Sequence, residues 1–224
     1  MTLHTSTPSR GPTLSRTLPC LSVLLVVLLA LGTTPALGQS GGVLDTKTGL
    51  RVGGTFMTFG GDDAPSDLDR RGGWLLGGFA VFDVTGPFAL QPELNYVQKG
   101  AESESGGSTV TTKLNYIELP ILAKIQTPSA GLVSPSVFLG PSAALNIKAE
   151  QEVGSSTSDI DDDIRGFDLG AVFGVGVDAN VGVGTLLVDA RYSLGLIDIS
   201  DDDDLAEEPS LRNQGFMLTV GYAF

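Results

Sequence analysis

Two runs of carboxylates have the clearest chemical capacity in this chain of 224 residues. Carboxylate oxygens are hard ligands of the kind that calcium prefers. The candidate calcium ligands are Asp159, Asp161, Asp162, Asp163, Asp201, Asp202, Asp203 and Asp204. Neither run has the ligand and glycine spacing of an EF-hand. The spacing therefore favours a solvated, mutually repelling surface, of the kind tolerated in high salt, over a specific calcium site.

A second set of charges lies inside otherwise apolar segments. Its members are Arg51, Glu93, Glu118, Lys124, Asp189 and Arg191. A cation that faces lipid at mid-bilayer costs roughly 2 to 4 kcal/mol, so in a membrane barrel these side chains are expected to point into the lumen and pair there. Such a network would plug an eight-stranded lumen rather than line a conducting pore. The alternative places some of them at the membrane interfaces, but the inward parity of Glu93, Asp189 and Arg191 favours the lumen.

Histidine and cysteine, which serve many enzymes as base, nucleophile or metal ligand, occur only near the start of the chain. His4 and Cys20 are the single histidine and the single cysteine. Both leave with a signal peptide if one is cut there, and the remaining chain then has neither imidazole nor thiolate. Zinc sites built on Cys or His, Ser-His-Asp triads and Cys-His dyads are thereby excluded. No catalytic residue, cofactor or enzymatic activity is predicted, and no motif supports a hydrolase built on carboxylates alone.

A secretory signal peptide is predicted at the start of the chain. Arg10 and Arg16 precede the apolar run Leu21–Leu31, and small residues suit cleavage after Gly38. The run is shorter than the roughly 20 residues of a membrane-spanning helix, which disfavours a retained anchor. The predicted organisation is a cleaved signal peptide over 1–38, a short periplasmic segment over 39–47 and one barrel domain over 48–224.

The barrel domain has eight segments that are predicted to be strands. In the closing strand an apolar row suited to lipid alternates with small residues suited to a crowded lumen. That row is Phe216, Leu218, Val220, Tyr222 and Phe224, and its expected partner is the first strand, near Leu50 to Phe56. The second strand is apolar on both faces, so periodicity does not predict its inward side. The strands are predicted over 48–59, 73–84, 88–99, 112–126, 135–148, 165–179, 185–198 and 213–224.

The predicted connections alternate between short and long, as in barrels with short periplasmic turns and long outer loops. The long ones are predicted over 60–72, 100–111, 149–164 and 199–212. They hold 18 of the 26 acidic residues (4, 2, 6 and 6 in chain order) against three basic residues, Arg70, Arg71 and Arg212. The rest of the barrel domain is balanced in charge. This sorting indicates acidic outer loops on a neutral barrel.

Six segments resemble the PorT-like outer-membrane β-barrel family. They are LQPELNYVQKG (90–100), LNYIELPILAKI (114–125), FLGPSAALNI (138–147), FDLGAVFGVGVD (167–178), DARYSLGL (189–196) and RNQGFMLTVGYAF (212–224). The most specific pieces are Pro-Glu-Leu with Gln-Lys-Gly, Tyr-Ile-Glu-Leu-Pro, and Ala-Arg-Tyr followed by Gly-Leu. The resemblance implies a small eight-stranded barrel without defined catalytic residues. Some members of that family are associated with protein secretion or gliding machinery.

These observations predict an all-β, eight-stranded, antiparallel, up-and-down transmembrane barrel in the outer membrane of a Gram-negative-type bacterium. Its expected role is structural or partner-docking, with outer-membrane lipid around the wall. One alternative is a component of envelope transport or protein secretion, with envelope or secretion proteins as partners. Another is a secreted, soluble, lipocalin-like barrel that binds an apolar ligand. Nucleic acid is not an expected partner because no outer loop is basic. The oligomeric state is not predicted.

Overall fold

The computed structural model describes residues 46–61, 68–105, 108–127, 132–161, 164–199 and 211–224. All of them belong to one compact unit, Leu44–Phe224. The predicted signal peptide and all but the last two residues of the segment 39–47 lie outside the described residues. Within the described residues, no helix has the length and apolar character needed to cross a membrane.

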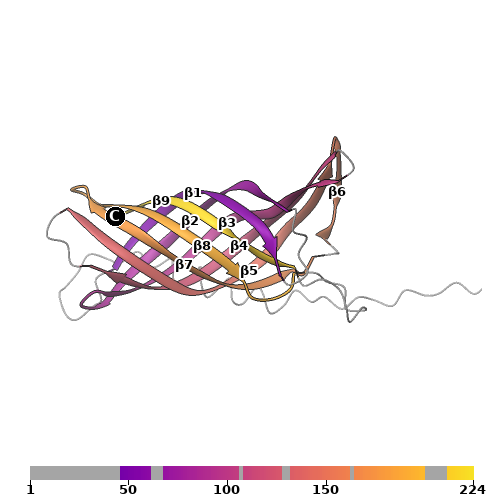
Figure 1. Cartoon of the computed structure of the whole chain (residues 1–224). Helices are drawn as coiled ribbons and strands as arrows, with labels where there is room; N and C mark the ends of the chain where they lie inside the picture. Colours follow the sequence, from indigo (N-terminus) through magenta and orange to yellow (C-terminus); the bar gives the residue numbers. More distant parts are fainter. Residues whose placement is uncertain (1–45, 62–67, 106–107, 128–131, 162–163, 200–210) are drawn as a thin grey trace, which may run out of the picture. The chain divides into compact units, whose positions relative to one another are not determined.

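The described part of the chain forms nine strands, of which eight close into a barrel (Figure 1). The strands are β1 Thr46–Gly60, β2 Asp69–Thr85, β3 Phe88–Ser105, β4 Ser108–Gln126, β5 Val133–Val153, β6 Ser156–Asp159, β7 Phe167–Asn180, β8 Thr185–Gly195 and β9 Arg212–Ala223. Around the barrel, each strand pairs antiparallel with its neighbours in chain order, and β6 pairs with β5 alone. The predicted eight-stranded up-and-down barrel is confirmed.

The ring closes between the last strand and the first. On this seam Phe216 pairs with Phe56, and Val220 pairs with Val52. Along β9, the residues from Phe216 to Tyr222 on the apolar row are 36–58% exposed, whereas the alternate positions are buried. The closing strand therefore turns one apolar row outward and one slim row into the lumen.

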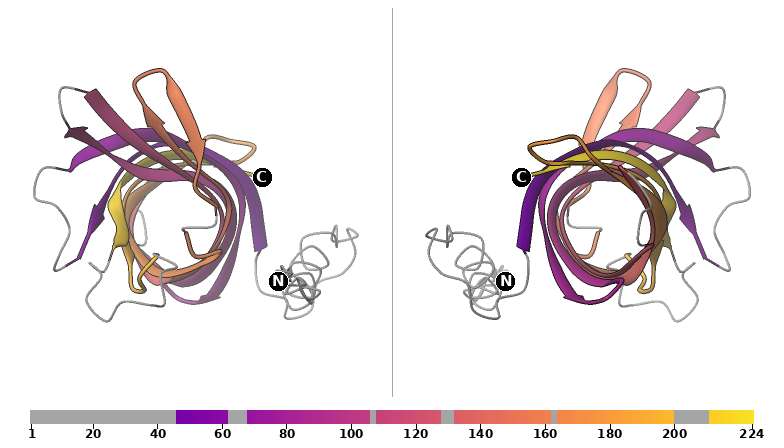
Figure 2. Two further views of the ribbon diagram at one scale, coloured as in Figure 1. Left: turned by 90° about the vertical axis from the view of Figure 1, so that its right-hand side faces the viewer. Right: turned by 90° about the vertical axis from the view of Figure 1, so that its left-hand side faces the viewer.

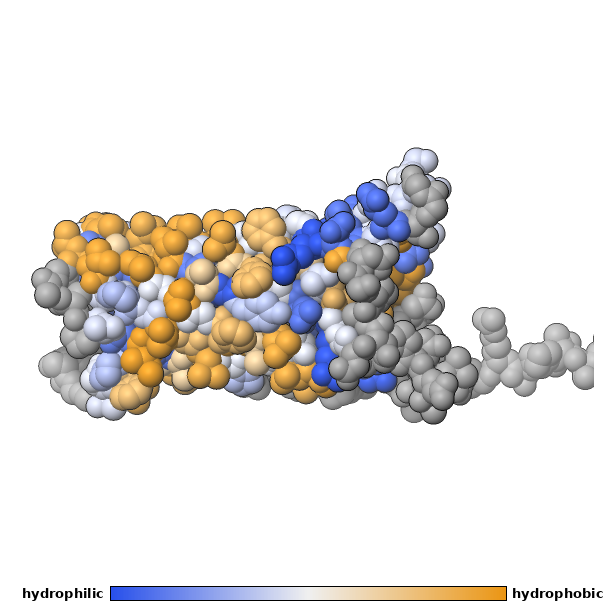
Figure 3. Space-filling model, in the orientation of Figure 1, coloured by the Kyte–Doolittle hydropathy of each residue, from blue (hydrophilic) through white to orange (hydrophobic). Residues whose placement is uncertain are grey.

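The outer wall of the barrel is apolar over most of its length, as Figure 3 shows for one face. The strand whose sides periodicity did not distinguish, β2, follows the same rule. Its Trp74 and Leu76 lie outward and exposed, whereas Leu75 and Phe79 are buried in the lumen. Because exposed apolar side chains cover the wall, it suits a surround of lipid rather than water.

The two ends of the barrel differ. At the short-turn end, β2 joins β3 through a turn at Gly86, which has a φ of +55°. The first strand, β1, begins at this end, and the last strand, β9, ends there. At the opposite, long-loop end, several strands continue past the ring and flare away from it (Figure 2). These extensions are called the projecting sheet below; it comprises 100–105, 108–115, 148–153 and 156–159.

The projecting sheet corrects two predicted loops. The predicted loop over 100–111 is wrong, because β3 and β4 pair as far as Ser105 and Ser108. The predicted loop over 149–164 is shorter than expected, because β5 runs to Val153, turns through Gly154 with a φ of +61° and returns as β6. Threonine and valine favour strands, and backbone pairing satisfies the amides despite the surrounding acidic side chains.

Candidate functional site

The lumen of the described barrel holds ten buried charged side chains. Five are cations and five are carboxylates, so their formal charges cancel. They are Arg51, Arg71, Lys99, Lys124 and Arg191, with Glu93, Glu118, Asp168, Asp178 and Asp189. Contacts divide them into two groups at different depths, called here the central network and the upper cluster.

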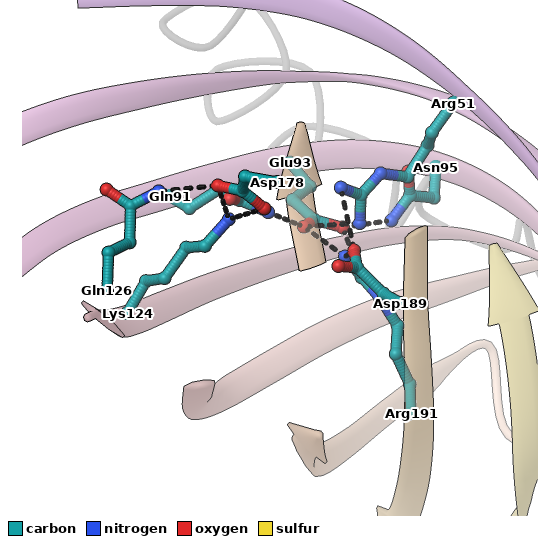
Figure 4. A network of polar contacts seen from close by, with 9 residues as sticks. All are labelled: Arg51, Gln91, Glu93, Asn95, Lys124, Gln126, Asp178, Asp189 and Arg191. Carbon is teal, nitrogen blue, oxygen red and sulfur yellow. Dashed lines mark hydrogen bonds and ion pairs between the residues drawn. The ribbon is translucent and has the colours of Figure 1, made fainter. Parts of the chain in front are cut away.

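The central network is built around one carboxylate, Glu93 on β3 (Figure 4). Its Oε1 accepts hydrogen bonds from Arg51 Nη1 at 2.8 Å and from Gln91 Nε2 at 2.7 Å. Arg191 donates from Nη1 to Oε2 at 2.8 Å and from Nη2 to Oε1 at 3.1 Å, and Asn95 Nδ2 donates to Oε2 at 3.0 Å. Glu93 thus joins three strands, β1, β3 and β8, through a bidentate arginine pair and three further donors.

A second carboxylate, Asp189 on β8, completes this arrangement. Its Oδ2 lies 2.7 Å from Arg191 Nη2 and 3.3 Å from Arg51 Nη2. Beside it, Lys124 Nζ binds both carboxylate oxygens of Asp178, at 2.9 and 2.7 Å, and Gln126 also donates to that carboxylate. The central network therefore pairs three cations with three carboxylates, which offsets the cost of burying each charge.

Aromatic rings support both arginines. Arg51 Cζ lies 4.6 Å from the centre of the Phe79 ring, and Arg191 Cζ lies 5.0 Å from that of Phe138. Inward-facing glycines make room for these rings. A Cβ added to Gly49 would lie 2.5 Å from Phe79 Cζ, and one added to Gly174 would lie 2.7 Å from Phe138 Cζ. The glycines scattered along the strands therefore have a packing role in the lumen.

The upper cluster lies nearer the long-loop end. Lys99 Nζ is 2.8 Å from Glu118 Oε2 and 3.9 Å from Asp168 Oδ2. Asn213 Nδ2 donates to Asp168 Oδ2 at 3.0 Å and to the Tyr116 hydroxyl at 3.2 Å. Arg71 differs from the other buried cations, because its Nη1 donates to a backbone oxygen, the Lys99 carbonyl, at 2.6 Å.

Apolar layers separate and cover the two charged groups. The layer between them is Met57, Leu75, Val97, Leu122, Phe138, Val172 and Met217. The layer toward the short-turn end is Phe79, Val81, Ala89, Leu187 and Ala223. The layer at the long-loop end is Leu114, Tyr116, Ala144, Ala149 and Ile199, with Phe59, Ile160, Ile164 and Leu211 packed against it. Apolar and charged layers alternate along the axis, so the described side chains fill the lumen.

The structure places the six lumen residues predicted from the sequence in two groups. Five lie together in the central network: Arg51, Glu93, Lys124, Asp189 and Arg191. Glu118 is buried at another level, with Lys99. Sequence reasoning missed Lys99, Asp168 and Asp178 as members, and it was wrong to assign the tenth buried charge, Arg71, to an outer loop. Lys99 shares the parity of Glu93 on β3, and the two aspartates share one inward row on β7, so parity was the available signal.

Most of the candidate calcium ligands lie outside the described residues. Asp162, Asp163 and Asp201 to Asp204 are in that category. The Asp161 backbone N–H donates to Asp159 Oδ1 at 3.0 Å, and the Ala149 N–H donates to the Asp161 carboxylate. The Asp161 carboxylate therefore fastens the segment after β6 to β5, and the Asp159 carboxylate holds that segment to the end of β6. The described residues contain no group of three or more His, Cys, Asp or Glu side chains placed to hold a metal ion.

The soluble, lipocalin-like interpretation is wrong. A ligand-binding barrel needs an open, largely apolar interior. Here the interior is occupied by paired charges and packed apolar layers, whereas the exposed apolar surface is on the outside. The cations and carboxylates of the lumen bind one another rather than a ligand-sized space.

Comparison with known proteins agrees with this geometry. The family model described as the outer membrane protein beta-barrel domain matches residues 40–201. No curated protein matches the chain.

Solved structures show similar folds at low identity. Ail, the attachment invasion locus protein of Yersinia pestis, is 15% identical, with 81% of this chain and 100% of that chain covered and a TM-score of 0.45. Neisserial surface protein A is 12% identical, with 80% and 99% covered and a TM-score of 0.48. OprG from Pseudomonas aeruginosa is 11% identical, with 82% and 98% covered and a TM-score of 0.45.

The family match covers well over half of the chain and includes seven of the eight wall strands. The short-turn end is accordingly the periplasmic end, and the long-loop end is the extracellular end. The chain belongs to the outer membrane protein beta-barrel domain family, and it is located in the outer membrane of a Gram-negative-type bacterium.

Proposed function

We propose that this protein is a non-enzymatic barrel with a structural or partner-docking role in the cell envelope. The observation that carries the proposal is the filled lumen, in which ten buried charges of zero net charge, nine of them in ion pairs, alternate with apolar layers. A lumen of this kind offers neither a path for solute nor a reactive group. The chain's single histidine and single cysteine, His4 and Cys20, both precede the barrel.

The outward face of the projecting sheet is the surface that suits docking. Cross-strand pairing aligns Glu102, Thr111, Glu152 and Thr157 in one row. The next row on the same face contains Lys113, Glu150 and Asp159. Carboxylates outnumber the cations on this face even though Lys113 pairs with Glu152. A partner with a basic surface would complement it and be steered toward it.

The PorT-like resemblance refines the proposal. The segments over 90–100 and 114–125 that carry it lie in β3 and β4, which lead into the projecting sheet. A PorT-like member would act as a component of envelope transport or protein secretion, with other envelope proteins bound stably to it. This alternative role differs in its prediction: a periplasmic or membrane partner should co-purify in a fixed ratio.

Conductance tests the filled lumen. Protein reconstituted in planar bilayers is expected to give no steady channel current, because apolar layers lie above and below the central network. A defined, reproducible single-channel conductance would overturn the proposal.

Site-specific photocrosslinking in cells tests docking. A crosslinking residue at Thr157, on β6, is expected to capture a partner, and capture should fall when Glu150 and Glu152 are replaced by glutamine. The matched control is the same residue at Val183, which is 91% exposed in a periplasmic turn. Equal capture at both positions, or capture at Thr157 that does not depend on the carboxylates, would leave the acidic face without a docking role.

A further inference from the structure

The apolar wall ends in a distinct polar border on the extracellular side of β9 and β1. On β9 the outward residues run from Phe216 through Gln214 to Arg212. On β1 they run from Phe56 to Thr58, and Thr58 pairs with Gln214. Lipid-facing aromatic side chains are thus followed, one outward position further along, by hydrogen-bonding groups. This succession marks the membrane interface.

Two exposed arginines flank this border. Arg212 on β9 pairs with Gly60 at the end of β1. Arg70 lies on β2 next to Arg71, and Arg71 pairs with Met57 of β1. The two arginines therefore lie on the strands either side of β1. Neither forms an ion pair with a described residue, in contrast to the paired lysines of the projecting sheet.

The guanidinium of Arg70 is held at the level of the aromatic side chains. Its Cζ lies 5.4 Å from the centre of the Phe216 ring, across β1. The Phe216 ring contacts Tyr192 at 4.9 Å, and Tyr192 contacts Phe173 at 5.4 Å between ring centres. This row of rings continues around β9, β8 and β7. A cation stacked on a lipid-facing ring is placed at headgroup depth rather than in bulk solvent.

Donors for an anion surround this position. Gln214 Oε1 accepts from the Tyr192 hydroxyl at 3.2 Å, which leaves its amide nitrogen free to donate. Guanidinium groups match phosphate geometry through parallel N–H donors.

We propose that Arg70 and Arg212, with Gln214 beside them, bind the phosphate of a lipid headgroup in the outer leaflet. The ligand is a lipid rather than free phosphate because the apolar wall begins directly below the donors, where acyl chains would pack. Arg70 and Arg212 are both exposed, so they can attract an anionic headgroup at this depth. This inference is independent of the partner-docking role.

Lipid titration followed by native mass spectrometry tests the site. The purified full chain in neutral detergent is titrated with diphosphorylated lipid A and, separately, with the same lipid after removal of both phosphates. The Arg70→Gln/Arg212→Gln double variant is compared with Lys148→Gln, which removes one exposed cation from the projecting sheet. A heat-modifiable gel shift checks that each variant forms the barrel.

The double variant is expected to bind the phosphorylated lipid about twenty-five-fold more weakly at low salt, since each of the two basic residues near an anionic membrane surface contributes about fivefold. Lys148→Gln should bind as the unchanged protein does, and the dephosphorylated lipid should not distinguish the variants. Equal affinity of the double variant and the unchanged protein would overturn the proposal. Competition by millimolar inorganic phosphate that removes the lipid completely would overturn it too, since the site would then recognise a free anion.

Discussion

The central network and the upper cluster solve the same problem, buried charge in a narrow lumen, with different side chains. In the central network, two planar guanidinium groups share Glu93 and Asp189, and each lies against an aromatic ring. In the upper cluster a single ammonium group, Lys99, lies between two carboxylates, and one of them, Asp168, also accepts a hydrogen bond from the neutral donor Asn213. Guanidinium can bridge several strands at fixed angles, whereas ammonium acts as a compact point charge.

The two groups also differ in their surroundings. The central network has apolar layers on both sides along the barrel axis. The upper cluster is covered by a layer that includes Ile160, Ile164, Ile199 and Leu211, which come from the connections after β6 and β8 rather than from the wall. Stability of the upper cluster thus depends on connections that fold over the lumen, whereas the central network depends on the wall itself.

Removal of Glu93 should have the largest effect. Glu93→Ala leaves Arg51 and Arg191 short of a shared carboxylate deep in the lumen, and breaking a buried pair in this way costs about 3 to 5 kcal/mol. Urea unfolding in detergent, followed by the heat-modifiable gel shift, measures the loss. Glu104→Ala, at an exposed position of the projecting sheet, is the control. A loss under about 1 kcal/mol, typical of an exposed pair, would contradict the description of the central network.

Removal of Lys99 should have a smaller effect. Lys99→Met leaves Glu118 and Asp168 without their nearest cation, and we expect a cost of about 1 to 3 kcal/mol because Asn213 still donates to Asp168. The same unfolding measurement applies. If Lys99→Met destabilises the barrel more than Glu93→Ala does, the proposed order of the two groups is wrong.

Removal of the Tyr116 hydroxyl tests the hydrogen bond between the two uncharged side chains of the upper cluster, Tyr116 and Asn213. Tyr116→Phe keeps the buried ring but removes the acceptor of the 3.2 Å hydrogen bond from Asn213 Nδ2. The expected loss is about 0.5 to 1.5 kcal/mol, the usual contribution of one hydrogen bond. Tyr96→Phe, a ring on the outer wall stacked against Trp74, serves as the comparison and should change stability less.

The smallest expected effect is at an exposed pair of the projecting sheet. The hydrogen bond from Lys148 Nζ to Glu150, at 2.8 Å, raises the pKa of Lys148 above its ordinary value. Glu150→Gln should lower that pKa, and the chemical shift of the Lys148 side chain, titrated by NMR, measures it. Because the folded pKa is raised, the pair's contribution is present at neutral pH and is lost as pH rises through that pKa. An unchanged titration curve would show that Glu150 does not act on Lys148.

Much of the wall was predictable from sequence because alternation is local. The outward rows of β7, β8 and β9 follow directly from residue order, as Phe173, Tyr192 and Phe216 illustrate. The loop over 100–111 was not predictable by the same means. Its acidic and polar side chains suggested solvent exposure, and exposure does not distinguish a loop from a strand that continues beyond the membrane.

By itself, the sequence determined the class of fold, the period of each strand, the inward parity of most lumen charges and the sorting of acidic residues away from the wall. Only the tertiary structure decided which inward charges meet. Glu93 and Arg191 are 98 residues apart, and Lys99 pairs with Glu118 rather than with the central network. The physical reason is stagger: the registers of all neighbouring strand pairs, including the β1–β9 seam where Gly49 pairs with Ala223, together set the depth of each strand, and no single strand carries that information.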